Sequence, residues 1–226
     1  MADFAKARRT MVDGQVRTAD VTDLRIIAAL LEVPREAYVP ADRLAMAYLD
    51  VDVPVGRGSR EGARDGGRAL LKPMVFAKLI QAAGIGETDH VLDLGCLTGY
   101  SAAVLARLAG SVVALEEDVA LARGAGEALA HTGAMNLSVV SGPLRGGWAT
   151  GAPYDVIIVE GAAEVVPDSL LSQLKEGGRL VCVVGRAPMG KAMIYRMAGG
   201  HATAQPLFDA AAPLLPGFVK PAAFVF

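Results

Sequence analysis

The chain has 226 residues, of which 53% are hydrophobic and 20% are charged, and its formal net charge is −2. This length and composition allow one substantial core and fit a single large domain. The small net charge gives no bulk attraction to nucleic acid or to an anionic membrane surface, so neither is expected as a partner.

The first 50 residues are predicted to be helical. Apolar residues recur at helical spacing over residues 24–31, where Asp20 or Thr22 can cap the helix and Pro34 ends it. A second helical segment is expected after Pro40.

Residues 55–73 are predicted to form a long loop, because glycine and arginine crowd this segment and no apolar period is present before its end. The part from Gly56 to Gly67 either covers a substrate as a lid or stays disordered. We therefore divide the chain into residues 1–72, a helical region and loop that pack on the remainder, and residues 73–226, the main domain.

Helices and strands alternate in the main domain. The expected helices cover residues 73–84, 101–110, 119–133 and 168–178, and the expected strands cover residues 90–95, 111–117, 137–142, 154–161 and 179–185. Continuously apolar strands separated by helices indicate a doubly wound α/β fold, with a mostly parallel sheet and helices on both faces. Residues 191–199 and 221–226 are predicted to be closing antiparallel edge strands.

The segment VLDLGCLTGY is typical of a ligand-binding turn at the carboxyl end of a first strand. Gly95 and Gly99 allow a sharp turn and close approach to a ligand, while Asp93 ends the strand with a carboxylate. The spacing Gly-x-x-x-Gly lacks the dinucleotide fingerprint, which argues against NAD. S-adenosylmethionine carries cationic groups that Asp93 can meet, and Glu116, ending the next strand, can accept hydrogen bonds from both ribose hydroxyls. Alternatively, the two acids merely cap helices or face solvent.

With these residues, the chain resembles the protein-L-isoaspartate O-methyltransferase family over residues 20–226. The segments similar to the family are PREAYVPADRLAMAYLDVDVPVGRG, NLSVVSGPLRGGWATGAPYDVIIVEGAA, DSLLSQLKEGGRLVCVVG and GFVKPAAFVF. The resemblance implies a seven-stranded Rossmann-like methyltransferase sheet. It also implies an S-adenosylmethionine-dependent enzyme of protein repair, whose partner is a protein or peptide with an isoaspartyl residue and whose acceptor is the misplaced carboxylate.

The resemblance further implies where the cofactor lies, against the turn after the first strand and the ends of the next two strands. The implied cofactor-binding residues are Asp93, Leu94, Gly95, Cys96, Gly99, Glu116, Glu117, Gly142, Pro143 and Leu144. No metal site is expected, because the three histidines lack ligand spacing.

Three departures from the family pattern fall in the ligand region. Leu97 stands where the family has a glycine, and Pro143 stands where the family has an acid. The family's Gly-Gln-Thr-Ile-Ser-x-Pro reads GRALLKP here, so Leu71 replaces the acceptor-site serine and the catalytic residue is unknown. We hypothesise that Arg68 or Lys72 binds the acceptor carboxylate instead; the alternative is that both are solvated loop charges.

These departures leave three functions open: an isoaspartyl methyltransferase, a catalytically silent relative that keeps the fold for ligand or partner binding, and a methyltransferase with a changed acceptor. A further departure, Glu160-Gly161 in place of a Thr-Ala pair, follows the fourth strand. Cys96 and Cys182 are expected to be reduced core thiols. With no signal peptide and no run of about 18 apolar residues, the protein is expected to be soluble and cytoplasmic, as a monomer or a homodimer.

Overall fold

A computed structural model describes residues 3–56 and 67–220 of the chain. The predicted loop from Gly56 to Gly67 and the predicted edge strand over 221–226 therefore lie almost entirely outside the described residues. Within the described ranges, no helix is long and apolar enough to cross a membrane.

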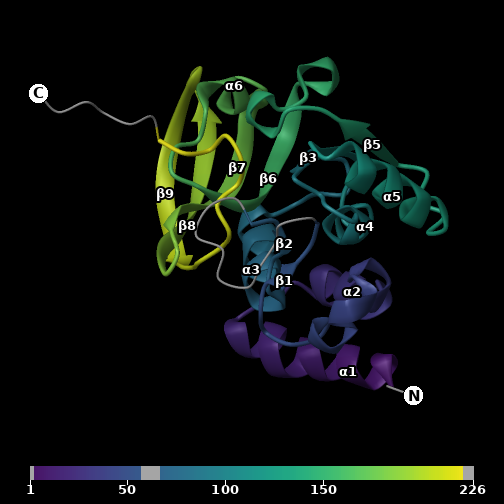
Figure 1. Ribbon diagram of the computed structural model, residues 1–226. Coiled ribbons are helices and arrows are strands. Elements are labelled where there is room, and N and C mark those ends of the chain that lie inside the picture. The colour runs from purple at the N-terminus through teal and green to yellow at the C-terminus, as the bar shows by residue number, and fades with distance from the viewer. Residues whose placement is uncertain (1–2, 57–66, 221–226) are drawn as a thin grey trace, which may run out of the picture.

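The main domain is built on a sheet of seven strands in the order β5-β4-β3-β6-β7-β8-β9 (Figure 1). The strands are β3 (His90–Leu94), β4 (Ser111–Glu116), β5 (Leu137–Ser141), β6 (Tyr154–Ala163), β7 (Leu174–Arg186), β8 (Met189–Ala198) and β9 (His201–Asp209). The five strands from β5 to β7 are parallel, and β8 and β9 close the sheet in antiparallel fashion. This confirms the predicted mostly parallel, doubly wound sheet.

Six α-helices accompany the sheet in the part of the chain that the structure describes. They are α1 (Phe4–Met11), α2 (Leu24–Glu32), α3 (Pro73–Ala83), α4 (Tyr100–Leu105), α5 (Val119–Ala130) and α6 (Asp168–Leu171). Helix α3 begins with Pro73 in its first turn and ends where Gly84 adopts a left-handed φ of 59°, as the sequence predicted.

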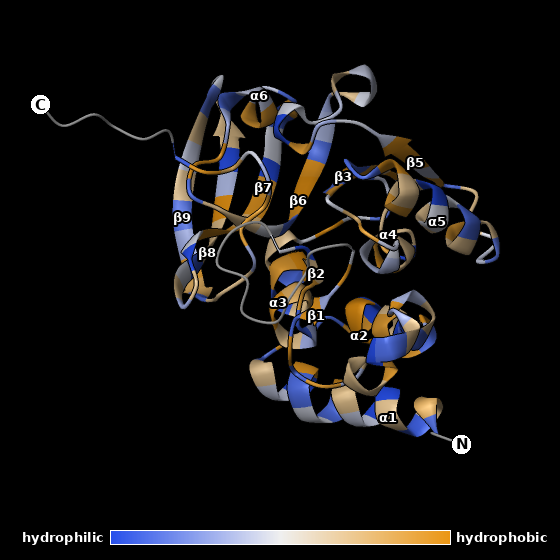
Figure 2. Ribbon diagram, viewed as in Figure 1, coloured by the Kyte–Doolittle hydropathy of each residue, from blue (hydrophilic) through white to orange (hydrophobic). Residues whose placement is uncertain are grey.

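Side chains of the central strands alternate between two core clusters. In β3, Val91 belongs to the cluster shared with α3, α4 and the N-terminal helices, whereas Leu92 and Leu94 belong to the cluster on the other face. The second cluster is closed by Leu170 of α6 and by the segment through Phe218. Apolar residues concentrate in α3, β6 and β7, while β9 at the sheet edge is largely hydrophilic (Figure 2).

The N-terminal region packs on the same core. Met11 and Leu30 belong to one cluster with Ile80 of α3, and α1 and α2 lie together beyond α3 from the sheet (Figure 1). A short antiparallel pair of strands, β1 (Val53–Pro54) and β2 (Ala69–Leu70), brings the two ends of the glycine-arginine segment together.

The structure corrects four details of the predicted elements. The cap of α2 is Asp23, whose carboxylate accepts the N–H of Arg25, and not Asp20 or Thr22. The segment after Pro40 is a 3₁₀ helix. The helix expected over 168–178 stops after one turn, because Leu174 already pairs with Tyr154 of β6 and sheet pairing overrides helix propensity. Strand β9 was not predicted; its polar sequence reflects its edge position.

Candidate functional site

Three carboxyl groups gather at the carboxyl ends of three neighbouring strands. In the sheet register, Asp93 of β3 lies level with Ala114 of β4 and with Ile158 of β6. Glu116 and Glu160 each follow one of these partners by two residues. Because side chains alternate along a strand, all three acids point to the same face of the sheet, the face that α3 and α4 cover.

The Asp93 carboxyl is fully buried. Its Oδ2 accepts a hydrogen bond from Ser101 Oγ at 2.7 Å, and its Oδ1 has no hydrogen-bond partner among residues 3–56 and 67–220. Burial, only partly offset by the Ser101 hydrogen bond, raises the pKa of Asp93 to about 7, and the charge of Glu116 adds to the rise. A cationic ligand beside Asp93 would favour its ionised form.

The Glu116 carboxylate is also fully buried, and it binds a guanidinium. Arg68 donates from Nη1 to Oε1 at 2.9 Å and from Nη2 to Oε2 at 2.8 Å, and its Nη2 also donates to the Gly95 carbonyl at 3.1 Å. Three backbone N–H groups, of Leu97, Glu117 and Asp118, complete the set at 2.9 to 3.0 Å. The Arg68 side chain is only 11% exposed, so it is not a solvated loop charge.

The turn after β3 has a left-handed backbone at three positions. Gly95 and Gly99 have φ values of 90° and 95°, and Leu97 between them has a φ of 53°. The Leu97 side chain is buried in the first core cluster, and this packing holds it in a conformation that leucine rarely adopts. The turn thus keeps the backbone geometry of a glycine-containing loop although a leucine stands at its centre.

Glu160 lies beside this turn. A Cβ atom on Gly95 would lie 3.8 Å from the Glu160 Cβ and 3.1 Å from Arg68 Nη2. Within the described part of the chain, Glu160 Oε1 has no hydrogen-bond partner. Burial raises the pKa of Glu160 well above its ordinary value, Asp93 raises it further, and the positive charges of Arg35 and Arg68 oppose the rise. Two carboxyl oxygens of this site are thus buried and have no hydrogen-bond partner among the described residues.

The segment after β5, residues 142–144, also lies near the acids. The Gly142 N–H donates to the Glu116 carbonyl at 3.1 Å, and Leu144 is fully buried, with its Cδ1 3.8 Å from where a Cβ on Gly95 would lie. Pro143 offers no N–H and no acid, so recognition along this segment falls to backbone groups.

Not every implied cofactor residue directs its side chain to the crevice. Leu94 points to the opposite face, into the second core cluster, and Glu117 is exposed. Cys96 is a buried free thiol, as is Cys182, and the Cys96 N–H donates to the Leu115 carbonyl at 3.2 Å. The Leu94 side chain therefore does not reach the three acids, and the backbone N–H groups of Cys96 and Glu117 already have partners.

The segment that corresponds to the family's acceptor motif is held by a buried arginine. Arg35 is 1% exposed, donates to the Leu71 carbonyl at 2.9 Å and to the Ala47 carbonyl at 2.8 Å, and lies over the Tyr100 ring at 4.7 Å. The Leu71 side chain is buried, so it offers an acceptor neither a hydroxyl nor a contact surface. No local sequence pattern points to Arg35, because its hydrogen-bond partners lie 12 and 36 residues away.

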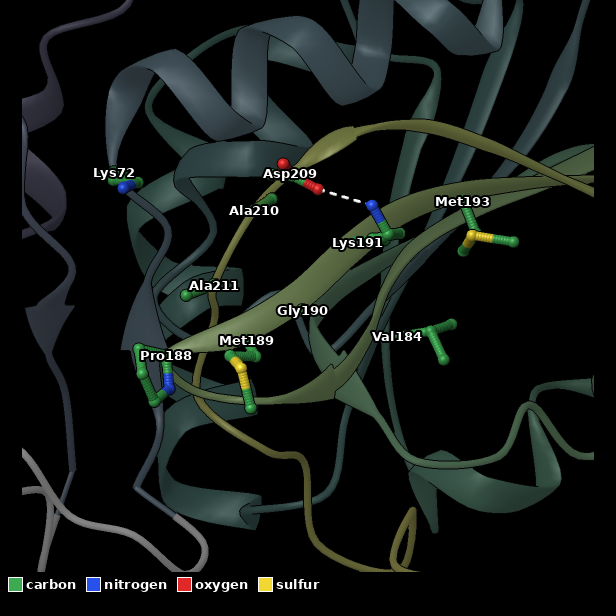
Figure 3. Close-up of a pocket in the computed structure, with 10 residues that line it drawn as sticks. All are labelled: Lys72, Val184, Pro188, Met189, Gly190, Lys191, Met193, Asp209, Ala210 and Ala211. Atoms are coloured by element: carbon green, nitrogen blue, oxygen red, sulfur yellow. Dashed lines mark hydrogen bonds and ion pairs between the residues drawn. The ribbon is translucent and has the colours of Figure 1, made fainter.

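A pocket of about 760 Å³ opens next to Lys72, where β7 ends and β8 begins (Figure 3). Its lining combines apolar side chains with cations and one acid: Lys72, Val184, Pro188, Met189, Gly190, Lys191, Met193, Asp209, Ala210 and Ala211. Lys191 pairs with Asp209 at 2.7 Å. The sequence pointed to Lys72 alone among these residues. Within residues 3–56 and 67–220, no three His, Cys, Asp or Glu side chains are arranged so that they could hold a metal ion.

A family model described as protein-L-isoaspartate(D-aspartate) O-methyltransferase matches residues 6–205 of the chain. The chain is 40% identical over 182 residues to protein-L-isoaspartate O-methyltransferase 1 of Rhodopseudomonas palustris (strain HaA2), covering 80% of this chain and 71% of the relative. It is 35% identical over 201 residues to protein-L-isoaspartate O-methyltransferase of Koribacter versatilis (strain Ellin345), covering 89% of this chain and 86% of the relative.

Solved structures share the fold. One protein-L-isoaspartate O-methyltransferase superposes with a TM-score of 0.76 at 24% identity, over 94% of this chain and 65% of that protein. A second, a putative protein-L-isoaspartate O-methyltransferase from Plasmodium falciparum in complex with S-adenosyl-L-homocysteine, superposes with a TM-score of 0.74 at 16% identity, over 95% of this chain and 99% of that protein. At these identities the superpositions establish the architecture alone.

Proposed function

The chain belongs to the protein-L-isoaspartate O-methyltransferase family, and from this premise we propose that it transfers a methyl group from S-adenosylmethionine to the carboxylate of isoaspartyl residues in damaged proteins. We further propose that it acts in the cytoplasm, because its two cysteines are free thiols. The observation that carries the proposal is the group of carboxyls at the ends of β3, β4 and β6.

The unsatisfied oxygens of Asp93 and Glu160 support a ligand with cationic groups. Each oxygen is buried without a partner among the described residues, and a buried polar atom of this kind is stabilised when a ligand supplies the missing hydrogen bond. The ammonium of S-adenosylmethionine can donate hydrogen bonds to these oxygens, and its sulfonium adds a positive charge without a hydrogen-bond donor. Glu116 would accept the ribose hydroxyls, and the backbone of Gly142 and Leu144 would face the adenine.

The methyl acceptor requires orientation and exclusion of water. When bound, S-adenosylmethionine supplies a methyl group on a sulfonium, which an ionised carboxylate accepts without a general base. We place the acceptor in the pocket of Figure 3, because this pocket lies at the carboxyl edge of the sheet and Lys72 contributes a cation to its lining. Lys72 is favoured over Arg68 for the acceptor carboxylate, because the Arg68 guanidinium is already bound to Glu116.

Two observations favour the alternative functions. Arg68 holds the carboxylate that the ribose needs, which favours a relative that keeps the fold without catalysis. The buried Leu71 in place of a serine favours a changed acceptor.

Methyl transfer to a synthetic peptide tests the proposal. With isotope-labelled S-adenosylmethionine, the chain is expected to form a base-labile methyl ester on a peptide with isoaspartate and none on the same peptide with aspartate. Glu116→Gln is expected to lower kcat/KM by about one to two powers of ten, since a hydrogen bond to a charged group contributes about 1.5–3 kcal/mol. Glu127→Gln, which changes an exposed glutamate of α5 outside the site, serves as the matched control.

The possible results separate the three functions. Absence of methyl ester together with absence of S-adenosylhomocysteine binding would establish the silent relative. Binding of S-adenosylhomocysteine without transfer to the isoaspartyl peptide would leave a changed acceptor or a silent ligand-binding relative, and a screen of other methyl acceptors would separate these two.

A further inference from the structure

We propose that Arg68 is a built-in competitor of the cofactor: its guanidinium occupies the Glu116 carboxylate that the ribose hydroxyls would bind, and it thereby sets cofactor affinity in this chain. This inference rests on the proposed function, since it concerns the same crevice. It assigns control of cofactor affinity to a residue that directly precedes β2 and lies outside the cofactor turn.

The contacts of Arg68 are those of a bidentate ion pair. Its two terminal nitrogens reach the two oxygens of Glu116 at 2.9 and 2.8 Å, which is the fork geometry in which guanidinium and carboxylate bind most strongly. The Glu116 side chain is 0% exposed and that of Arg68 is 11% exposed, so solvent screens the pair only weakly. Nη2 also binds the Gly95 carbonyl, at the residue where the backbone must approach a ligand.

Arginine and ribose cannot share Glu116. Glu116 already accepts five N–H groups, two from Arg68 and three from the backbone of residues 97, 117 and 118. A carboxylate has about four lone-pair sites, so none is left for a further donor. The backbone donors are fixed by the turn and by the start of α5. Two ribose hydroxyls can therefore enter only by replacing the Arg68 side chain.

The backbone on both sides of the Arg68 side chain is held by the β1–β2 ladder. The Arg68 carbonyl accepts the Val55 N–H at 2.8 Å, and the next residue, Ala69, pairs with Pro54 in the β1–β2 ladder. The backbone is thus anchored, and in the proposed exchange only the Arg68 side chain leaves Glu116. The resembling family motif has glutamine at this position, and a neutral amide lacks the charge and the fork that hold Glu116.

Calorimetric titration with S-adenosylhomocysteine tests the proposal on the full chain. Arg68→Gln is expected to bind S-adenosylhomocysteine at least tenfold more tightly than the unmodified chain. Arg68→Lys keeps the charge but loses the bidentate fork, so its affinity is expected to fall between the two. Arg25→Gln, which removes a partly exposed pair with Asp23 on α2, is the matched control and is expected to leave the affinity unchanged. Far-UV circular dichroism establishes that each variant is folded.

The results distinguish failure of this proposal from failure of the proposed function. If the unmodified chain binds S-adenosylhomocysteine and both Arg68 variants bind it equally or more weakly, the competitor role is wrong while cofactor binding stands. If neither the unmodified chain nor any folded variant binds it, both the competitor role and the proposed cofactor are wrong.

Discussion

Leu97 carries a conformational cost that its side chain offsets. A left-handed φ costs a residue with a Cβ atom about 1–2 kcal/mol, whereas full burial of a leucine side chain contributes about 1.5–3 kcal/mol. Leu97 has both features, with a φ of 53° and 1% exposure. In the family motif a glycine adopts this backbone conformation at no cost. Here the packing of the Leu97 side chain stabilises the same turn.

Substitution at Leu97 is expected to reverse the usual order of alanine and glycine. Leu97→Ala loses the buried side chain but keeps the backbone cost, so Leu97→Gly should be more stable than Leu97→Ala by about 1 kcal/mol. Urea unfolding measures the difference. At Leu94, in the middle of the sheet, the same pair of substitutions should follow the opposite order. An alanine variant at position 97 as stable as the glycine variant would refute the explanation.

The raised pKa of Asp93 predicts that the stability of the fold depends on pH. Its pKa is about 7 in the folded chain against an ordinary value of 3.8, so between these values the folded state holds a proton that the unfolded state releases. The free energy of unfolding therefore falls as pH rises through this window, by at most about 1.4 kcal/mol per pH unit. Asp93→Asn should reduce that slope between pH 5 and pH 7, measured by urea unfolding, and Glu160, whose pKa is also raised, should account for the slope that remains.

Asp155→Asn provides the control for this measurement. The Asp155 carboxylate has a lowered pKa, because its hydrogen bonds and the charge of Lys175 outweigh the effect of burial, so its contribution is lost only in more acidic solution. It should leave the slope between pH 5 and pH 7 unchanged. An equal slope in Asp93→Asn and the unmodified chain would contradict the proposed titration of Asp93.

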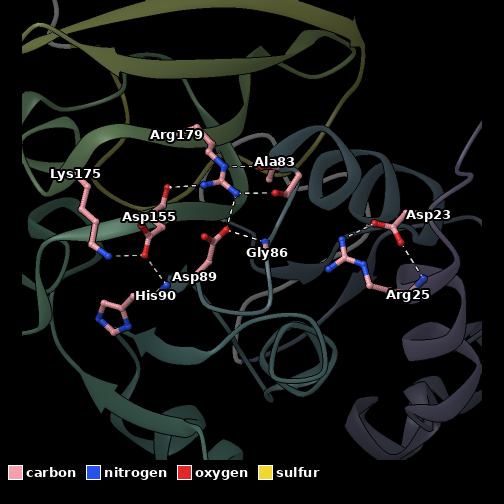
Figure 4. A network of polar contacts seen from close by, with 10 residues as sticks. Asp23, Arg25, Ala83, Gly86, Asp89, His90, Asp155, Lys175 and Arg179 are labelled. Carbon is pink, nitrogen blue, oxygen red and sulfur yellow. Dashed lines mark hydrogen bonds and ion pairs between the residues drawn. The ribbon is translucent and has the colours of Figure 1, made fainter.

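At the scale of elements, a single arginine of β7 ties the end of α3 to the base of the sheet (Figure 4). Arg179 donates to the Ala83 carbonyl at 2.6 Å and to the Gly84 carbonyl at 2.7 Å, which satisfies the orphan carbonyls of the helix end. It also pairs with Asp89 at 2.6 Å, and both side chains are about 15% exposed. This contact joins three segments that are far apart in the sequence.

Loss of this arginine is expected to destabilise the fold. Arg179→Met leaves Asp89 and two helix-end carbonyls without their donor, and it should lower the free energy of unfolding by about 2–3 kcal/mol. Thermal or urea unfolding measures the change. Lys191→Met, which removes the exposed pair with Asp209, should change stability by about 0–1 kcal/mol. Equal effects of the two substitutions would contradict the assigned role of Arg179.

The elements that could be predicted are those whose own sequence carries the signal. The structure confirms the strands β3 to β6, which were predicted from apolar runs, and helix α3, which was predicted from the proline and glycine at its ends. The helix over 168–178 was wrong after its first turn, and β9 was missed, because strand pairing with distant partners decided both. The end of an apolar strand can be recognised in the sequence, so Asp93 and Glu116 could be predicted as site residues. The partner of Glu116 lies 48 residues away, and no local pattern encodes that pairing.

At the scale of the whole molecule, the alternation of helices and strands was enough to predict the sheet and the edge at which we propose that the ligand binds. The sheet register then brings Asp93, Glu116 and Glu160 together. The β1–β2 ladder positions Arg68, which directly precedes β2, beside Glu116. The fold thus places three acids and one buried cation, Arg68, together at the proposed cofactor site. The assignment of Glu116 to the ribose is the central claim of this account.

A crystal structure of the chain with S-adenosylhomocysteine tests that claim most directly. We predict that the ribose hydroxyls will bind the Glu116 carboxylate and that the Arg68 side chain will have left it. S-adenosylhomocysteine bound elsewhere, or bound while the Arg68–Glu116 pair remains intact, would contradict the claim.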